Sequence, residues 1–307
     1  MSADRLGDPV AGTGPGADPL RSGPECARVN GSAAQDVSVL DRGLHYGDGL
    51  FETIACLGGR PRFLPLHLQR LAAGCARLGL ALPDVARLRR EVLELAAGSP
   101  RAIVKVLLTR GAALSRGYAL TGQEQPTRIT LRYPWPPEDP AGSEAGVRVR
   151  IATVRLGENP LLAGLKHCNR LEQILARREW TDPAIADSLM FSSSGALISG
   201  TMSNVFLVLD AKLVTPRVDR CGVAGVMREA VLAAAAAAGM PTAERVLDAQ
   251  DLSRASEVFL TNALTGIRPV RELAGAPLAP GPLTRRLQQR LAPLMTAGPG
   301  AGGNADG

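Results

Sequence analysis

The stretch that decides the fold is Leu161-Leu162-Ala163-Gly164-Leu165-Lys166-His167-Cys168-Asn169-Arg170-Leu171-Glu172. Lys166 is one of only three lysines in the chain, and every other cationic side chain is an arginine. A primary amine, unlike a guanidinium, can lose its proton near neutral pH and can form a Schiff base. Lys166 lies between an apolar run and a helical pattern, a junction from which an amine can point into a cleft. It is therefore the candidate catalytic residue, and the alternative is one more surface lysine.

The other two lysines occupy ordinary positions. Lys105 lies in the alternating strand pattern of residues 103–107, and Lys212 lies at a turn between two predicted strands. Neither position suggests chemistry.

Composition limits the classes of protein that the chain can represent. Its 307 residues suffice for one large or two modest domains. The net charge is +6, but the arginines are dispersed and aromatic residues make up only 3%. This pattern argues against a nucleic-acid surface and favours small anionic ligands. No apolar run approaches a membrane span, no signal peptide is recognised, and no metal site is predicted.

The five cysteines form no close CxxC pair. An odd number of unpaired thiols is typical of a reduced protein, so a cytoplasmic location is predicted.

Composition also divides the chain into regions. Residues 1–26 and 297–307 are rich in Gly, Pro and Asp and are predicted to be disordered tails. A run of prolines at 134, 136, 137 and 140 marks the boundary between a domain at 27–138 and a domain at 139–296.

The first predicted domain alternates strands and helices. Strands are predicted around residues 28–30, in a segment that ends near residue 57, at 101–109 and at 127–133. A helix is predicted at 84–97, after the one described next. Pro65 suits the first turn of a helix whose leucines fall on one face as far as Leu78. Arg70 lies beside that face, where its aliphatic stem could simply cover the edge of the core.

The second predicted domain begins with a strand at 147–154. A helix from 171 to about 180 follows, with Leu171, Ile174 and Leu175 predicted to face inward. Further strands are predicted at 187–192, 195–199, 205–209, 213–214 and 257–261, and a last helix at 281–295. The glycine-rich entry to a helix at 226 leaves free N–H groups at the positive end of its dipole, which suits a phosphate.

A Schiff-base lysine together with a phosphate site is what pyridoxal phosphate needs. The motifs resemble those of the fold-type IV pyridoxal-phosphate enzymes, and within them the aminodeoxychorismate lyase branch. The resemblance runs from about Arg28 to Val270 and is carried by residues 41–49, 115–118, 155–160, 166–173 and 219–228. It implies an α+β / α/β fold, with a small N-terminal α/β domain and a larger C-terminal mixed β domain with helices.

The resemblance also implies roles for single residues in cofactor binding. Lys166 would hold pyridoxal phosphate covalently, Arg70 would contact its phosphate, and the backbone of Val226 and Met227 would supply donors at the helix start. Asn262 falls in the segment that closes over the phosphate.

Four further residues match positions that bind the substrate in the family that the chain resembles. Arg116 and Tyr118 match a loop that reaches a substrate carboxylate across a dimer interface, Tyr46 matches an aromatic lining, and Ala263 falls in the closing segment.

The chain departs from the family pattern at Ser199. Family members usually place a Glu at this position, where its carboxylate keeps the pyridine nitrogen protonated. A hydroxyl can hydrogen-bond that nitrogen but cannot stabilise its positive charge as a carboxylate does. Transamination would suffer more from this change than a lyase reaction that is driven by formation of an aromatic ring.

The activity implied by the resemblance is that of a homodimeric lyase that converts 4-amino-4-deoxychorismate to 4-aminobenzoate and pyruvate in folate biosynthesis. The alternatives are a D-amino-acid or branched-chain aminotransferase of the same fold and a non-enzymatic dimer that keeps the scaffold.

Overall fold

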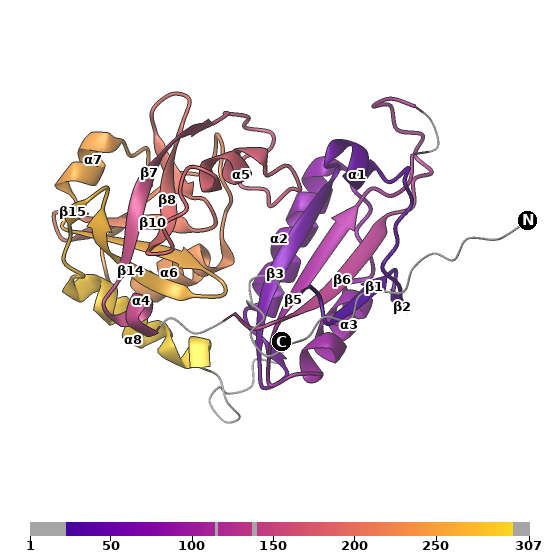
Figure 1. Cartoon of the computed structure of the whole chain (residues 1–307), viewed down its shortest axis with the longest axis horizontal. Helices are drawn as coiled ribbons and strands as arrows, with labels where there is room; N and C mark the ends of the chain where they lie inside the picture. The colour runs from indigo at the N-terminus through magenta and orange to yellow at the C-terminus, as the bar shows by residue number, and fades with distance from the viewer. Residues whose placement is uncertain (1–22, 114–115, 137–139, 297–307) are drawn as a thin grey trace, which may run out of the picture.

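The computed structural model describes residues 23–113, 116–136 and 140–296, which form two lobes (Figure 1). The predicted tails lie outside the described residues, except that strand β1 already begins at Cys26. Both lobes combine a sheet with helices, which agrees with the predicted mixed architecture.

The first lobe contains a six-stranded antiparallel sheet with the strand order β2-β1-β6-β5-β3-β4. Its strands are β1 (Cys26–Val29), β2 (Ser32–Ala33), β3 (Gly49–Leu57), β4 (Arg60–Pro61), β5 (Arg101–Thr109) and β6 (Thr127–Pro134). Its helices are α1 (Arg42–Tyr46), α2 (Leu64–Leu78) and α3 (Val85–Ala97).

The core of this lobe follows from the sequence pattern. Alternate residues of β5 are buried, because a strand points successive side chains to opposite faces. They pack against the apolar faces of α2 and α3, where Leu71 and Leu88 are almost fully buried. Each such leucine stabilises the fold by roughly 1.5–3 kcal/mol. The predicted helices at 65–78 and 84–97 are confirmed.

The second lobe contains a nine-stranded mixed sheet with the order β12-β11-β10-β13-β14-β7-β8-β9, and β15 pairs with β14. Its strands are β7 (Val147–Leu156), β8 (Ile185–Ser192), β9 (Leu197–Gly200), β10 (Asn204–Leu209), β11 (Lys212–Pro216), β12 (Thr242–Arg245), β13 (Glu257–Asn262), β14 (Gly266–Leu273) and β15 (Ala276–Pro277). Its helices are α4 (Pro140–Glu144), α5 (Leu171–Arg177), α6 (Val226–Ala237), α7 (Ala249–Arg254) and α8 (Pro282–Thr296).

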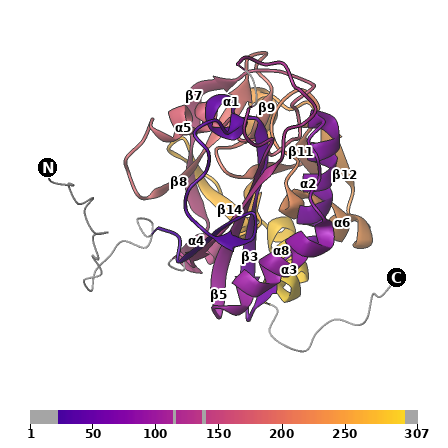
Figure 2. The same ribbon diagram turned by 90° about the vertical axis from the view of Figure 1, so that its right-hand side faces the viewer.

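Three apolar clusters hold this sheet to its helices. In one of them the rings of Phe206 and Phe259 stack at 4.9 Å, next to Met227 and Val231 of α6. Figure 2 shows α2, α3, α6 and α8 on the same side of the molecule, and α2 contacts α6 across the two lobes. Within the described residues, no helix has both the length and the apolar character that a membrane crossing requires.

One prediction about the second lobe is wrong. Helix α5 ends at Arg177 rather than near Trp180, and Leu171, Ile174 and Leu175 are exposed instead of inward. The helix turns its small residue Ala176 toward the core, where it is fully buried. The apolar pattern does mark one face of the helix, but the described residues of the chain do not cover this face.

The segment around Lys166 connects the two lobes. On one side, the Phe51 amide donates to the Lys166 carbonyl at 2.9 Å, and the Cys168 amide donates to Gly49 at 2.9 Å. On the other side, Gly164 exchanges backbone hydrogen bonds with Gly222 and Ala224, just before α6. Gly164 has φ +80°, which a glycine adopts without strain. The lysine is therefore fixed between β3 and the start of α6.

Candidate active site

A cavity of about 320 Å³ lies where these elements meet, and we call it the first cavity. Several elements from both lobes contribute to its wall. They are β3 with Phe51 and Thr53, α2 with Arg70, the lysine segment with Lys166, Arg170 and Gln173, the turn 199–204, the entry to α6 with Gly222, Val223 and Gly225–Met227, and the turn 261–264.

The Lys166 amine lies inside this cavity, as predicted. Its Nζ is 4.3 Å from the centre of the Phe51 ring, and the side chain is buried. Burial, followed by the positive charge of Arg70, lowers the pKa of Lys166 to about 8. Lys105 and Lys212 do not line the cavity. The amine that can be neutral near physiological pH is thus the one that faces the cavity.

Arg70 lines the cavity and is held in place by a buried carboxylate. Its Nε donates to Oε1 of Glu52 at 2.8 Å, and its Nη1 donates to the Ala224 carbonyl at 2.9 Å. Glu52 also contacts Nδ1 of His67 at 2.6 Å. Burial alone raises the pKa of the Glu52 carboxyl, but the hydrogen bonds from Arg70 and His67 hold it below its usual value. Arg70 is therefore more than a stem covering the edge of the core.

The first turn of α6 faces the cavity with free backbone donors. Its N-cap, Gly225, supplies no side chain, so the leading N–H groups have no partner within the helix. A Cβ at Gly225 would lie 2.0 Å from Oδ1 of Asn204, so only glycine fits there. Val226 and Met227 both line the cavity, as predicted. This helix start suits an anion.

Ser199 lies at the cavity wall near the end of β9, just before the turn 201–203. Its hydroxyl is 2.9 Å from the Gly200 carbonyl, and only 8% of the residue is exposed. The same turn is fixed by the buried carboxylate of Asp187, which accepts from the Thr201 amide at 2.9 Å and from the Ser203 hydroxyl at 2.7 Å. Ser199 therefore occupies a defined position in the wall.

The turn 261–264 closes another side of the cavity. Oδ1 of Asn262 accepts from the amides of Leu264 at 3.0 Å and Thr265 at 2.8 Å, so this oxygen shapes the turn. Asn262 and Ala263 both line the cavity, as predicted.

The remaining predicted substrate residues lie elsewhere on this chain. Tyr46, Arg116 and Tyr118 do not line the first cavity. The rings of Tyr46 and Tyr118 are 5.2 Å apart, and Arg42 donates to the carbonyls of Gly117 and Tyr118. Tyr118 is 82% exposed. The structure thus groups these aromatics with one another and not with Lys166 of the same chain.

Some functional residues were missed by the sequence analysis. Glu52 and His67 have no motif of their own, although a carboxylate between Leu50 and Ile54 on the buried face of a strand is a signal. Arg170 and Gln173 belong to the string that follows Lys166, but no role was predicted for them.

Comparisons with known proteins agree with this geometry. Residues 49–273 match the family model of the amino-transferase class IV proteins. The chain is 35% identical over 269 residues to the aminodeoxychorismate lyase of Vibrio harveyi, covering 86% of this chain and 98% of that protein.

Solved structures show the same fold. The 4-amino-4-deoxychorismate lyase of Pseudomonas aeruginosa superposes with a TM-score of 0.85 at 46% identity, over 88% of this chain and all of that one. The branched-chain amino acid aminotransferase of Escherichia coli superposes with a TM-score of 0.78 at 24% identity, over 89% and 95% of the two chains, and supports the fold alone. The predicted fold-type IV class is confirmed, and the chain belongs to the amino-transferase class IV family.

Proposed function

We propose that the chain is a pyridoxal-phosphate-dependent lyase that converts 4-amino-4-deoxychorismate to 4-aminobenzoate and pyruvate, a step that would serve folate biosynthesis. One observation carries the proposal: the Lys166 amine and the uncapped N–H groups at the first turn of α6 line the same cavity. The chain is also 35% and 46% identical, over nearly its whole length, to two proteins described as this lyase.

The residues of the first cavity fit pyridoxal phosphate. Lys166 would hold the cofactor covalently, and the N–H groups of Val226 and Met227 with Arg70 would bind its phosphate. Ser199 and Asn262 would lie beside it. When bound, the cofactor supplies an aldehyde that condenses with amines and a ring that withdraws electrons from the bound amine.

Lys166 would then move the protons of the reaction. With a pKa of about 8, its amine can take a proton and return it near neutral pH. It would take the proton from the substrate ring carbon and deliver it to the departing enolpyruvate. The electrons of the C–H bond complete the aromatic ring while the C–O bond to the enolpyruvyl group breaks, so the products are 4-aminobenzoate and pyruvate.

The runner-up is an aminotransferase that acts on D-amino or branched-chain amino acids. Among the described residues, no Asp or Glu lines the first cavity, and Ser199 occupies the position at which the family pattern has Glu. A carbanion-like state would be stabilised less in such a cavity. The lyase reaction gains its driving force from aromatisation, and this difference favours the lyase.

The third alternative is a protein without catalysis that keeps the scaffold. The buried, depressed-pKa amine of Lys166 supports an enzyme instead. Visible absorbance of the purified protein, which a covalently bound cofactor would produce, tests this alternative.

We also infer a homodimer in which each active site takes residues from both copies. Large apolar side chains that remain exposed include Leu161 at 79% and Leu171 at 73%. Leu171, Ile174 and Leu175 form one exposed apolar face of α5, and a second copy of the chain would cover it. Tyr46, Arg116 and Tyr118 would reach the cavity of the partner, where Arg116 would bind a carboxylate of a small anionic substrate.

The dimer is tested by sedimentation. Leu171→Asp should shift the protein toward monomer, whereas Leu294→Asp, at a comparably exposed leucine of α8, should leave the mass unchanged. A Leu171→Asp protein that keeps the dimer mass would contradict this interface.

Five free cysteines, of which Cys56, Cys75 and Cys221 are buried, support a reducing, cytoplasmic location.

The proposed reaction is tested with purified protein, pyridoxal phosphate and 4-amino-4-deoxychorismate. We expect equimolar 4-aminobenzoate and pyruvate, and no product from Lys166→Ala. Keto-acid-dependent amino transfer without 4-aminobenzoate would instead identify the aminotransferase.

A further inference from the structure

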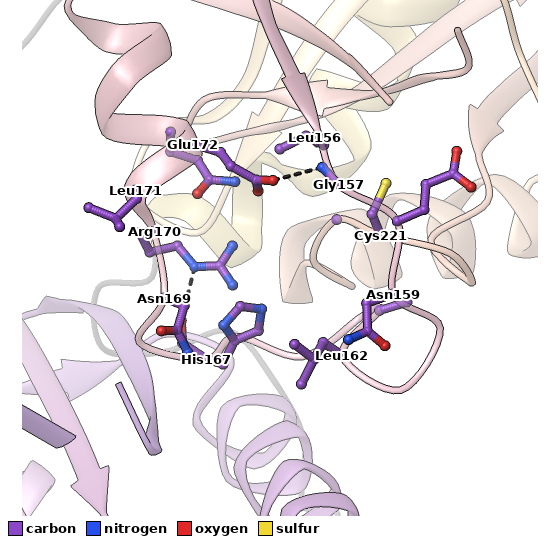
Figure 3. Close-up of a pocket in the computed structure, with 14 residues that line it drawn as sticks. Leu156, Gly157, Asn159, Leu162, His167, Asn169, Arg170, Leu171, Glu172 and Cys221 are labelled. Atoms are coloured by element: carbon purple, nitrogen blue, oxygen red, sulfur yellow. Dashed lines mark hydrogen bonds between the residues drawn. The ribbon is translucent and has the colours of Figure 1, made fainter. Parts of the chain in front are cut away.

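A second cavity of about 320 Å³ lies beside the first (Figure 3). It is formed by the end of β7, the connection to α5 and the residues before α6. Arg170, Gln173 and Gly222 line both cavities, so the two spaces adjoin across these residues. His167 and Cys221 line only the second cavity.

The two carboxylates at the wall of the second cavity already have partners. Glu172 accepts from the Gly157 amide at 2.7 Å (Figure 3). Glu158 accepts from Nε of Arg220 at 2.6 Å. Both acids are therefore held by partners of their own, although the charge of Glu172 still acts on Arg170 and raises its pKa.

Three buried polar atoms at this wall lack a hydrogen-bond partner within the described part of the chain: Nη2 of Arg170, Nδ1 of His167 and Oε1 of Gln173. Buried polar groups are rarely left without partners, and each exception calls for an explanation. These atoms come from one short segment. His167 lines only the second cavity, and Arg170 and Gln173 lie where the two cavities adjoin, which points to a ligand at this wall.

Arg170 provides the charge. Its Nε donates to the His167 carbonyl at 2.9 Å, but no carboxylate of the described residues forms an ion pair with its guanidinium. Burial lowers the pKa of Arg170 from its ordinary value. The charge of Glu172 offsets the effect of burial only in part, because Glu172 forms no ion pair with Arg170. A buried cation without a carboxylate in contact is unfavourable, and an anion bound next to Arg170 would stabilise it.

His167 provides a neutral donor. Burial, followed by the charge of Arg170, lowers the pKa of His167 to about 4, so the ring is neutral near pH 7. A neutral imidazole donates from one nitrogen and accepts at the other. One guanidinium and one neutral donor match a carboxylate better than a phosphate dianion, and Leu156, Leu162 and Cys221 offer an apolar wall for a hydrocarbon body.

We propose that the second cavity binds the carboxylate of a small organic acid through Arg170 and His167. Since the cavity adjoins the first one, the acid would be either the 2-oxo acid that the reaction releases or the aromatic acid product with its substrate precursor. This choice of occupant rests on the proposed function, whereas the carboxylate site itself does not.

Calorimetry on the cofactor-loaded full-length protein tests the site. Pyruvate and 4-aminobenzoate are the two probes, and 4-aminobenzamide is the uncharged control. We expect one acid to bind, with a dissociation constant raised about 10-fold or more in His167→Phe and in Arg170→Gln, because a charge-assisted contact is lost. Arg178→Gln, at an exposed arginine that lines neither cavity, should leave binding unchanged.

The variants also control for folding. His167→Asn keeps a hydrogen-bond donor and should restore most of the affinity that His167→Phe loses. Whichever of pyruvate and 4-aminobenzoate binds more weakly to His167→Phe than to wild type is the ligand of the second cavity. Binding of neither acid to the loaded wild-type protein, or equal affinity in wild type and His167→Phe, would overturn the proposal. Because binding is measured without turnover, a protein that lacks lyase activity but binds the acid would refute only the proposed function.

Discussion

Arg70 stabilises the first lobe and, under the proposed function, would also bind the cofactor phosphate, and comparing Arg70→Met with a double variant separates the two roles. Its guanidinium forms a buried ion pair with Glu52, which also contacts His67. Only 3% of the Glu52 side chain and 14% of the Arg70 side chain are exposed. Removing the arginine leaves a buried carboxylate with one neutral partner, since burial keeps the pKa of His67 below its ordinary value.

Breaking a buried pair in this way costs about 3–5 kcal/mol. The double variant Arg70→Met/Glu52→Gln removes both charges, so it should be more stable than the single variant by on the order of 1–3 kcal/mol. Both variants would also lose the proposed contact between Arg70 and the cofactor phosphate. We therefore expect the cofactor dissociation constant to rise about 10-fold or more in each.

Urea unfolding of the cofactor-free protein measures the first effect, because no bound ligand then contributes to stability. Absorbance titration with pyridoxal phosphate measures the second. Arg77→Met is a matched control, because this arginine of α2 bonds backbone carbonyls and lies outside the first cavity. A single variant as stable as wild type would refute the buried pair, and an unchanged dissociation constant would refute the phosphate contact.

Other predictions concern the lysine and the cavity wall. Borohydride reduction should attach the cofactor irreversibly to Lys166. Label on Lys105 instead would refute the assignment of Lys166 as the lysine that forms the Schiff base. The rate at which the cofactor attaches should rise roughly 10-fold per pH unit below pH 8 and level off above it, because the pKa of Lys166 is lowered to about 8 and only the neutral amine reacts; a flat profile from pH 6 to 8 would contradict this. Gly225→Ala should weaken cofactor binding, since its Cβ would lie 2.0 Å from Oδ1 of Asn204, and unaltered binding would show that the helix start can shift. Ser199→Glu should raise the ratio of amino transfer to pyruvate release, measured with D-alanine and with 4-amino-4-deoxychorismate; a fall of both rates with the cofactor still bound would refute the electronic argument.

Local signals in the sequence were sufficient for much of the site. The lysine was found by its rarity and by its place between an apolar run and a helix. The start of α6 was found from the glycine-rich entry, which is a local pattern, whereas the reason for glycine at 225 is the close approach of Asn204 in the packed structure. Structure confirms that both signals meet in one cavity.

Other features depend on contacts that sequence periodicity does not contain. The pattern of Leu171, Ile174 and Leu175 indicates an apolar face, but it does not say whether the same chain or another copy covers it. Likewise, Glu52 alternates onto the buried face of β3, yet its partners are on α2 and are known only after helix and strand are packed. Tertiary packing decides both cases.

The charge of the first cavity also emerges only from the packed structure. Arg70 of α2 lines one space with Lys166 and Arg170 of the lysine segment, and no described carboxylate lines it with them. The nearby acids already have hydrogen-bond partners. Glu52 contacts His67 and Nε of Arg70, and Asp187 accepts from Thr201 and Ser203. Glu52 balances the charge of Arg70, so the positive charge that remains in the cavity comes from Lys166 and Arg170. This charge suits a phosphate-bearing cofactor and a substrate with two carboxylates. The same excess of positive charge opposes protonation of a basic ring nitrogen, and a serine at 199 does nothing to offset it. This cavity thus favours a reaction whose driving force lies in its product over one that depends on a strongly stabilised carbanion.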